Sequence, residues 1–504
     1  MKSCALQSVA KAVADRRFRP SFAIKSKSHT RRVFNLIPFH DTLAIQHMNR
    51  ATLRISHVGL RGVVGPGGMT AAHAMDFAAA FGEFLFDGPV VISRDTRSSG
   101  VMFREGIIAS LQATGHDVID LGIVSTPVLQ HAIRKRNAAG GISISASHNG
   151  AEWNALKFFG ASGTYLSTAE AGELLDIYHL RKFRFVEWNH IGGLQHESNA
   201  IDHYLDDLAT AFDFPALRRF RVVVDCCNGT SSLILRRLIE RHGFKQFHLI
   251  NEQTEGVSFA HEPAINKQVV GLQLAPLIRP LNAEAGFLFD ADSDRVAFAT
   301  EAGEAVSEEM VLPMLADHQL QKGPGKLVIT NISTTGLLED IAARHNGRVI
   351  RVPVGRQAAT DALASYKPGQ IAIAGEGTGA VMMPQFRFVY DGIASMLAIL
   401  TMMYDRGQTL TEITAGYPKY TILKGQIPLV SQRIPALFLE LRKRFAGQRI
   451  DTTDGLRVDL DGAWAHVRVS QTEPIVRVIC EQRGEAPKSL YDSILELVET
   501  YASA

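Results

Sequence analysis

The chain has 504 residues, which is more than one hydrophobic core usually supports, so we expect several domains. Hydrophobic residues make up 46% and charged residues 21%, as in ordinary globular proteins, and a net charge of only +2 argues against binding to nucleic acid or to a membrane surface. No apolar run reaches the length of about 18 residues that would predict a transmembrane helix.

The cysteines indicate a reducing compartment. Cys4, Cys226, Cys227 and Cys480 form neither a disulfide framework nor the paired CxxC spacing of a zinc site. The adjacent Cys226 and Cys227 follow a run of valines, which is typical of structural positions. We therefore expect a cytoplasmic protein.

Residues 1–50 differ from the rest of the chain. Between residues 16 and 32 they carry several arginines and lysines with few acids and with several serines, which is the composition of an organelle transit peptide. Since the rest of the chain does not need this segment, we favour an unstructured extension or an upstream start, with the true start at Met48. We exclude it from the predicted fold.

Beyond this segment strands and helices alternate. Thr70 is a suitable N-cap for an apolar helix over residues 71–86, and Gly115 ends a second helix that reaches about Thr114. Apolar and β-branched runs predict strands at 89–93, 118–121 and 142–145. Strands that alternate with helices predict βαβ units and a mainly parallel sheet covered by helices.

The alternation of strands and helices is repeated twice more along the chain before the pattern changes. Further strands are predicted at 220–225, 285–289, 327–331, 349–354 and 371–374. From about residue 412, short strands and a last helix from Lys488 predict a smaller α+β unit. We predict an α/β protein with three similar mixed-sheet α/β domains and a smaller C-terminal α+β domain: domain I at 51–200, domain II at 201–305, domain III at 306–411 and domain IV at 412–504.

A Ser-His-Asn sequence follows one of the predicted strands of domain I. Ser147, His148 and Asn149 stand where this strand ends, and open α/β sheets bind their ligands at such ends. A serine in this place is a candidate nucleophile or phosphate carrier. Alone, the three residues are also compatible with an ordinary turn.

Three aspartates alternate directly after an apolar strand. Asp290, Asp292 and Asp294 can converge on one hard cation, and oxygen ligands suit Mg²⁺ or Ca²⁺ better than zinc or copper. An EF-hand is an alternative because Glu301 falls at its last ligand position, but Arg295 occupies the position where the sharp turn needs glycine. A solvated acidic turn is a second alternative. We predict a Mg²⁺ site.

A loop near the C-terminus offers donors for a phosphate group. Arg468, Ser470, Gln471, Thr472 and Arg477 combine guanidinium, hydroxyl and amide groups between two predicted strands. Such groups can surround a phosphate with forked and single donors. An ordinary β-turn with surface arginines is the alternative.

A glycine-rich strand end offers groups for a sugar. Glu376 and Thr378 stand among glycines that allow close approach of the backbone to a ligand. Lys157, ten residues after Ser147, and Arg61 are weaker candidates for the same site. Together these loops offer a nucleophile, a cation site, groups that can bind sugar hydroxyls and groups that can bind a phosphate. Phosphoryl transfer to or from a phosphosugar needs this set of groups.

From residue 52 onward the chain resembles the α-D-phosphohexomutase family. The matching segments are residues 145–149 with Lys157 for its phosphoserine loop, 290–295 for its Mg²⁺ loop, 375–379 for its sugar-binding loop and 468–474 for its phosphate loop. Their order and separations also match. The resemblance implies four domains around a central cleft, with one loop from each domain.

The resemblance also implies a reaction. Phosphorylated Ser147 would give its phosphoryl group to a hexose phosphate, the bisphosphorylated sugar would turn over in the cleft, and its other phosphate would return to Ser147. The implied catalytic residues are Ser147, His148, Lys157 and Arg295. The implied ligands of one Mg²⁺ per chain are Asp290, Asp292, Asp294 and, through its phosphate, Ser147. The implied substrate-binding residues are Arg61, Arg356, Glu376, Thr378, Arg468, Ser470, Gln471, Thr472 and Arg477.

The chain departs from the family pattern at a few positions. Gly150 stands where proline is usual, and Ala291 and Ser293 replace glycines. We expect these replacements to be tolerated if φ there is below zero. Ala380 replaces a histidine that many members have, which obscures the sugar preference. The segment 375–391 is more similar to the archaeal-type phosphoglucosamine mutase and phosphomannomutase branches.

We therefore expect a phosphohexomutase with a small phosphosugar as its partner and hexose 1,6-bisphosphate as activator. Phosphomannomutase and phosphoglucosamine mutase activities are favoured, and phosphoglucomutase activity is the alternative. A catalytically silent sugar-phosphate sensor and a metal-dependent phosphatase are rival hypotheses. We expect no nucleic-acid partner, no membrane association, and a monomer or homodimer.

Overall fold

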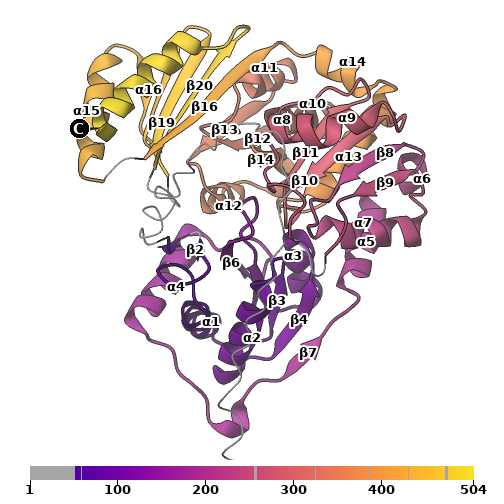
Figure 1. Cartoon of the computed structure of the whole chain (residues 1–504), viewed down its shortest axis with the longest axis vertical. Coiled ribbons are helices and arrows are strands. Elements are labelled where there is room, and N and C mark those ends of the chain that lie inside the picture. Colours follow the sequence, from indigo (N-terminus) through magenta and orange to yellow (C-terminus); the bar gives the residue numbers. More distant parts are fainter. Residues whose placement is uncertain are drawn as a thin grey trace, which may run out of the picture. The chain divides into compact units, whose positions relative to one another are not determined.

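The computed structural model describes residues 52–57, 59–254, 258–323, 325–384, 386–428, 431–470 and 475–503. Within these residues the strands form four sheets, each accompanied by helices (Figure 1). None of the helices in the described part is long and apolar enough to cross a membrane. The sheets confirm the predicted fold class, and the predicted extension of residues 1–50 lies outside the described residues.

The first sheet is mixed and has its strands in the order β1-β2-β6-β5-β3-β4-β7. β3, β4, β5 and β7 pair in parallel, whereas β1, β2 and β6 pair antiparallel. The strands are β1 (Arg54–Ser56), β2 (Gly59–Val63), β3 (Val90–Arg94), β4 (Val118–Ile123), β5 (Gly140–Ile144), β6 (Trp153–Gly160) and β7 (Leu194–His196). The helices are α1 (Ala71–Leu85), α2 (Gly100–Ala113), α3 (Thr126–Lys135) and α4 (Thr168–Leu180). Thr70 caps α1 as predicted, because its hydroxyl accepts a hydrogen bond from the backbone of His73 at 3.4 Å.

The second sheet has the order β11-β10-β8-β9, with a parallel group of three strands and an antiparallel hairpin, β10–β11, at one edge. The strands are β8 (Val222–Asp225), β9 (Phe247–Ile250), β10 (Ala285–Phe289) and β11 (Val296–Thr300). The helices are α5 (Ala200–Ala211), α6 (Phe214–Leu217), α7 (Ser231–His242), α8 (Lys267–Val269) and α9 (Ala275–Ile278).

The third sheet has the order β13-β12-β14-β15, and only β15 pairs antiparallel among these described strands. The strands are β12 (Leu327–Asn331), β13 (Arg348–Val352), β14 (Ile371–Glu376) and β15 (Ala380–Met382). The helices are α10 (Val311–Lys322), α11 (Leu337–Arg344), α12 (Arg356–Ala364), α13 (Gly392–Arg406) and α14 (Leu410–Ala415). The strand predicted at 349–354 ends earlier, at Val352, and Gly355 leads into α12 with a φ of +146°.

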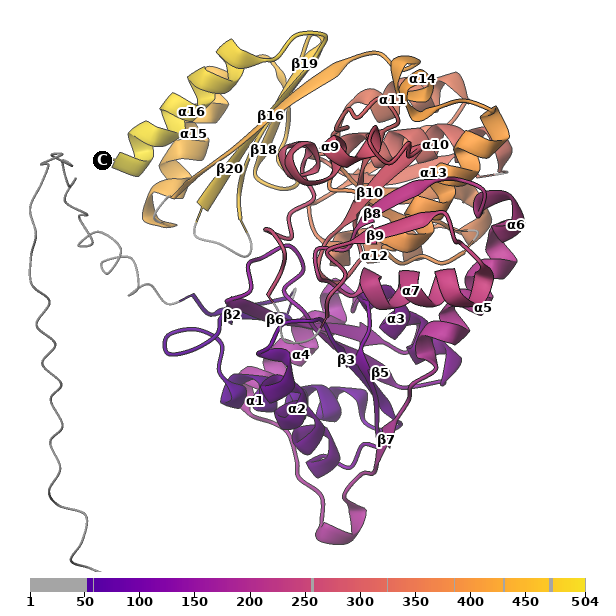
Figure 2. The ribbon, with the colours of Figure 1, turned by 45° about the vertical axis from the view of Figure 1, so that its right-hand side comes forward.

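The fourth sheet is antiparallel, in the order β16-β20-β19-β18-β17. The strands are β16 (Tyr420–Pro428), β17 (Arg449–Asp451), β18 (Leu456–Leu460), β19 (Ala463–Val469) and β20 (Ile475–Arg483). The helices α15 (Ile434–Arg444) and α16 (Lys488–Ser503) lie together on one face of this sheet (Figures 1 and 2). This is the smaller α+β unit predicted from the sequence.

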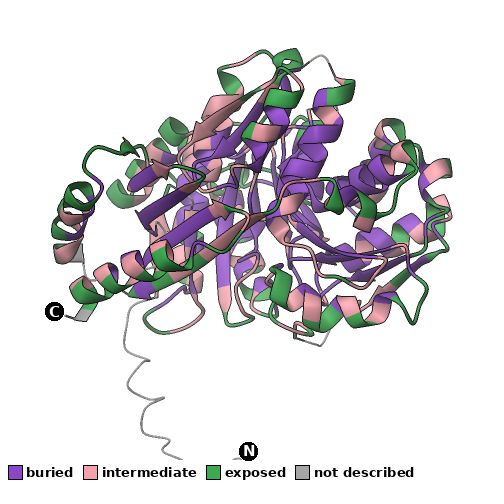
Figure 3. Ribbon diagram, turned by 90° about the horizontal axis from the view of Figure 1, so that it is seen from above, coloured by how far each residue is buried: buried purple, intermediate pink, exposed green. Residues whose placement is uncertain are grey.

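The apolar interior continues across the first three sheets. The largest cluster of buried apolar side chains includes Val91 of β3, Phe287 of β10 and Ile329 of β12. A separate cluster that includes Leu437 and Val478 fills the space between the fourth sheet and its helices. Figure 3 shows buried strands inside and helices with exposed outer faces. Because close packing fixes these strands, it also fixes where the loops at their ends begin.

Polar contacts join the third and fourth sheets. The fully buried His466 of β19 faces the Ser333 hydroxyl at 2.8 Å and the Asp454 carbonyl at 2.6 Å. Because a carbonyl only accepts, Nε2 of His466 carries the proton and Nδ1 accepts from Ser333. Burial lowers the pKa of His466 to about 4, so the ring is neutral in the folded protein at neutral pH.

We predict that His466 makes stability fall in acid. Its pKa is about 4 in the folded protein against 6.5 for an ordinary histidine, so between these values the unfolded chain binds the proton more readily and folding weakens as the pH falls. The His466→Gln variant lacks this titrating group. The free energy of unfolding of the wild type should therefore exceed that of the variant by about 2–3 kcal/mol less at pH 4.5 than at pH 7.5, measured by urea unfolding. A difference that is the same at both pH values would contradict this assignment.

Candidate active site

Ser147 lies just beyond β5, and its side chain is buried against the second sheet. Its hydroxyl donates a hydrogen bond to Asp290 Oδ2 at 2.6 Å. The residue has a φ of +52°, a left-handed conformation that is strained for serine and is often found at functional sites. Two contacts hold it: its backbone N–H donates to the Ser145 hydroxyl at 3.0 Å, and its carbonyl accepts from Arg97 Nη2 at 3.0 Å.

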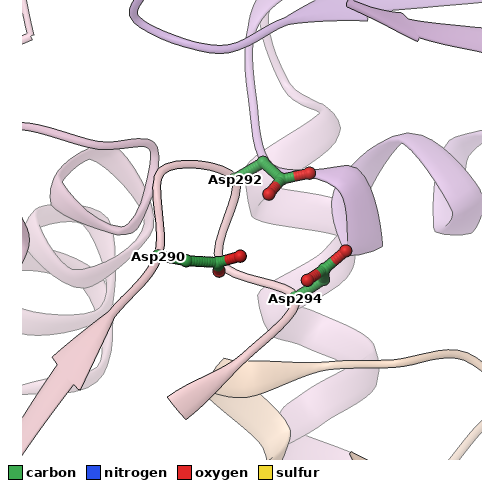
Figure 4. Close-up of side chains that lie close together, drawn as sticks. All are labelled: Asp290, Asp292 and Asp294. Carbon is green, nitrogen blue, oxygen red and sulfur yellow. The ribbon is translucent and has the colours of Figure 1, made fainter. Parts of the chain in front are cut away.

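The three aspartates lie on the loop between β10 and β11 (Figure 4). Their carboxylates gather on one side of the loop, with one ligand oxygen from each within 4.8 Å of the others, and all three side chains are buried. Because β10 and β11 form an antiparallel hairpin, the helix–loop–helix geometry of an EF-hand is excluded. Burial equally excludes the alternative of a solvated acidic turn.

The residues present fit a divalent cation. Among the described residues, Asp292 Oδ1 and Asp294 Oδ1 are buried and have no hydrogen-bond donor. Burial and the charges of Asp294 and Asp292 raise the pKa of Asp290 well above its usual value. A hard cation with oxygen ligands would satisfy these free oxygens and remove the repulsion among the carboxylates.

The condition for tolerating the replacement of a family glycine is not met at one position of this loop. Ser293 has a φ of +59°, in the left-handed region that favours glycine. The hairpin loop needs a left-handed residue between Asp292 and Asp294, and the Ser293 hydroxyl is held by the Thr230 hydroxyl at 2.9 Å. Gly150 and Ala291 are not among the described residues with positive φ, so the condition is met at those two positions.

Three cations balance the charge of Asp294. Its Oδ2 accepts from Arg356 Nη1 at 2.6 Å and from Lys157 Nζ at 3.1 Å, and its Oδ1 lies 3.6 Å from Arg295 Nε. Burial alone would raise the pKa of Asp294, but the charges of Arg356, Lys157 and Arg295 outweigh it and hold this pKa well below the usual value. Lys157 also pairs with Asp292. Sequence reasoning named these cations for the site, and the structure brings them together with the aspartates.

His148 is a neutral hydrogen-bonding group. Arg295 Nη1 faces His148 Nδ1 at 3.3 Å, and since a guanidinium only donates, the ring proton lies on Nε2. Burial and the positive charges of Arg295, Arg61 and Arg477 lower the pKa of His148 well below its usual value. His148 can therefore donate a hydrogen bond at neutral pH without carrying a charge.

Glu376 and Thr378, which are predicted to bind the sugar, contact each other at the end of β14. Thr378 donates to Glu376 Oε2 at 3.4 Å, and Tyr390, which the sequence reasoning missed, donates to Glu376 Oε1 at 3.1 Å. Gly379 has a φ of +73°, and a Cβ there would lie 2.2 Å from the carbonyl of Val296, so only glycine fits. This turn fixes the Glu376 carboxylate at the site.

The C-terminal loop that is predicted to bind phosphate is described in part. Arg468 Nε donates to Asp454 Oδ2 at 2.9 Å, and the backbone of Ser470 donates to the carbonyl of Ile475 at 2.9 Å. The predicted residues Gln471 and Thr472 lie outside the described residues.

A cavity connects these loops, and its lining is strongly cationic. The described lining residues include seven cations, namely Arg54, Arg61, Lys157, Arg295, Arg356, Arg468 and Arg477. The same lining includes a single carboxylate, Glu376. Ser147, the three aspartates and Thr378 are not among the lining residues. Each aspartate contacts a lining cation, and Ser147 donates its hydrogen bond to one of them, Asp290. A cavity with this charge selects an anionic ligand such as a phosphorylated sugar.

Sequence reasoning missed several residues of this region. Arg97, which holds the carbonyl of Ser147, had a signal because it follows β3 in a polar loop. Tyr165 had none: it lies in an ordinary loop, yet its hydroxyl contacts Arg356, and the rings of Tyr165 and Tyr390 lie 4.9 and 5.2 Å from the Arg356 guanidinium.

Comparisons with known proteins agree with this geometry. Three family models match, described as phosphoglucomutase/phosphomannomutase alpha/beta/alpha domain I over residues 55–184, domain II over 202–303 and domain III over 308–420. The exact domain boundaries predicted above stay predictions.

Similar proteins cover most of the chain. A Thermococcus kodakarensis protein named "Phosphoglucomutase/phosphomannomutase" is 34% identical over 85% of this chain and 94% of its own. A Pyrococcus horikoshii protein named "Probable phosphoglucosamine mutase" is 34% identical over 85% of this chain and 93% of its own. The crystal structure of a phosphoglucomutase/phosphomannomutase family protein from Burkholderia thailandensis shares the fold, with a TM-score of 0.73, 22% identity, and coverage of 89% of this chain and 97% of that one. The chain therefore belongs to the phosphoglucomutase/phosphomannomutase family, the α-D-phosphohexomutases, and is a phosphohexomutase, an isomerase that acts on hexose phosphates.

Proposed function

We propose that the enzyme interconverts hexose 6-phosphate and hexose 1-phosphate through phosphorylated Ser147 and a bisphosphorylated sugar. The observation that carries the proposal is the contact of 2.6 Å between the Ser147 hydroxyl and Asp290, next to a cavity lined by seven cations. A nucleophile, a cation site and an anion-binding cavity are thus combined in one place, as phosphoryl transfer requires.

Each half of the reaction exchanges a phosphoryl group for a proton. In the first half the bond between Ser147 Oγ and phosphorus breaks, phosphorus bonds to a sugar hydroxyl oxygen, and the hydroxyl proton ends on Ser147. In the second half the other phosphate of the sugar moves to Ser147, and the proton returns to the oxygen that it leaves. Lys157 and Arg295 stabilise the negative charge of the transferring group, and neutral His148 donates a hydrogen bond beside it.

Asp290, Asp292 and Asp294 would hold one Mg²⁺ together with a phosphate oxygen on Ser147. When bound, the ion supplies positive charge that offsets the charge developing in transfer. The free carboxylate oxygens of Asp292 and Asp294 and the raised pKa of Asp290 support this assignment. Hexose 1,6-bisphosphate would act as activator by phosphorylating Ser147.

The cations farther from Ser147 would hold the substrate. Arg468, Ser470, Gln471 and Thr472, with Arg477 of the neighbouring strand β20, would bind the phosphate that does not react. A fixed anchor of this kind lets a sugar bind in two orientations with either end at Ser147. The other proposed substrate contacts are Arg61 and Arg356 for anionic oxygens, and Glu376 and Thr378 for sugar hydroxyls.

We favour mannose and glucosamine phosphates as substrates, with glucose phosphates as the alternative. The names of the relatives span these possibilities. Ala380 is buried at the site and offers no polar atom to a sugar, so discrimination would depend on Glu376 and its partners. The cytoplasmic location and the monomeric or homodimeric state stay predictions.

We predict that Ser147→Ala abolishes isomerisation. Without the hydroxyl that carries the phosphoryl group, the rate with mannose, glucose or glucosamine 1-phosphate should fall at least about a thousandfold, while sugar phosphate still binds. Ser493→Ala, which removes a hydroxyl on α16, is the matched control and should keep full activity. The wild-type protein should also carry the extra mass of one phosphoryl group, which the Ser147→Ala variant should lack.

The products of this assay separate the rival functions. Release of inorganic phosphate without isomerisation would point to a phosphatase. Binding of sugar phosphate with neither turnover nor phosphate on Ser147 would point to a sensor. Substantial isomerisation by Ser147→Ala would contradict the proposed mechanism outright.

We also predict that Mg²⁺ stabilises the protein through the aspartate loop. After removal of metal with EDTA, Mg²⁺ at about 100 times its Kd should add about 2.7 kcal/mol to the free energy of unfolding, seen as a rise in Tm. Asp292→Asn should weaken this stabilisation strongly, because it removes a charged ligand. Asp492→Asn on α16, an exposed position, should leave it unchanged. If Mg²⁺ raised the Tm of both variants by the same amount, the ion would bind elsewhere.

A further inference from the structure

Arg54 lies on the face of the first sheet that borders the cavity. In the antiparallel pair of β1 and β2, Arg54 stands directly opposite Arg61, and both residues line the cavity. Side chains alternate along a strand, and the neighbour Ile55 packs against the apolar core on the other face, which fixes this orientation. Arg54 was not among the site residues that the sequence indicated.

Arg54 differs from the other cations of the cavity in having no protein partner. Within the described part of the chain its side chain makes no hydrogen bond or ion pair, whereas the side chain of Arg61 donates to Asn149 Oδ1 at 2.8 Å and that of Arg468 pairs with Asp454. Lys157, Arg295 and Arg356 are all engaged by the aspartate loop. Two arginines directly opposite each other also destabilise a strand pair, unless an anion lies near them.

The proposed reaction needs a cation of this kind. While the bisphosphorylated sugar turns over, its phosphates leave both the Ser147 end and the Arg468 end of the cavity, and the charged side chains there can return to Asp294 and Asp454. Each phosphate carries a charge of about −1.5 to −2, so the turning intermediate needs positive charge from elsewhere to stay bound. Arg54 can supply it without breaking an existing ion pair.

We propose that Arg54 is a further substrate-binding residue, which together with Arg61 holds a phosphate group of the bisphosphorylated sugar during its reorientation. The inference rests on the proposed function. Its consequence is that the bisphosphorylated intermediate stays bound. When this intermediate escapes, Ser147 is left without phosphate, and the enzyme is inactive until added hexose bisphosphate phosphorylates Ser147 again. Arg54 thus lowers the need for activator.

The test uses Arg54→Gln in the full-length enzyme with Mg²⁺ and glucose 1,6-bisphosphate as the probe. The Kd of the probe, measured by calorimetry, and the probe concentration for half-maximal steady-state isomerisation should each rise about tenfold, as expected for the loss of a charge-assisted contact in a partly exposed site. The Kd of glucose 1-phosphate should change less, by under about threefold, because it lacks the second phosphate.

Two variants control this measurement. Arg54→Lys keeps the charge and should restore most of the affinity for the bisphosphate. Arg449→Gln removes a charge from the exposed edge strand β17, where the side chain is 87% exposed, and should change neither quantity.

The outcomes distinguish the inference from the function on which it rests. An unchanged Kd and activator requirement in Arg54→Gln, with normal isomerisation by the wild type, would overturn the role of Arg54 and leave the proposed function intact. If the affinities for glucose 1-phosphate and for the bisphosphate fell by the same factor, the proposed role of Arg54 in retaining the bisphosphorylated intermediate would be overturned. Absence of isomerisation by the wild type with all three hexose 1-phosphates would overturn the proposed function and the inference together.

Discussion

The charge of three buried carboxylates on one short loop constrains the whole site. Burying an uncompensated charge costs several kcal/mol, so Asp290, Asp292 and Asp294 are tolerated only where other segments bring positive charge to them. Lys157 comes from β6 of the first sheet, 135 residues away from Asp292, and Arg356 comes from the start of α12. Charge compensation therefore ties three sheets to one point, and the same contacts place Ser147 beside the loop.

Because charge is compensated locally, the net charge of the whole chain does not indicate whether the protein binds anions. A net charge of +2 over the chain coexists with a cavity lined by seven cations and one carboxylate, because acids elsewhere balance the total. Inside the cavity the cations act at short range in a partly desolvated space, which lowers the pKa of Arg61 to about 10 through burial and the charges of Arg356 and Arg295. An arriving phosphate relieves this repulsion, so the cavity favours anions before any specific contact forms.

The sequence predicted those parts of the site that depend on local pattern. Ser147, the aspartates and Glu376 follow strongly apolar strands, and the ends of such strands meet in α/β folds, so their convergence could be expected. Tertiary register and backbone conformation could not be predicted in this way. The pairing of Arg54 with Arg61 depends on a strand of three residues, and the left-handed conformation of Ser293 depends on a partner, Thr230, far away in sequence.

The third and fourth sheets are joined at the far end of the cavity by one carboxylate. Asp454 Oδ2 accepts from Arg468 Nε at 2.9 Å and from the backbone of Val354 at 3.1 Å. Val354 is followed by Gly355, whose φ of +146° suits glycine, and then by Arg356 at the start of α12. Arg468, which lines the cavity, and Arg356, which pairs with the aspartate loop, therefore share a structural anchor. A phosphate that draws Arg468 away would remove one of the two described donors to the Asp454 carboxylate, so this side chain physically couples the two ends of the cavity.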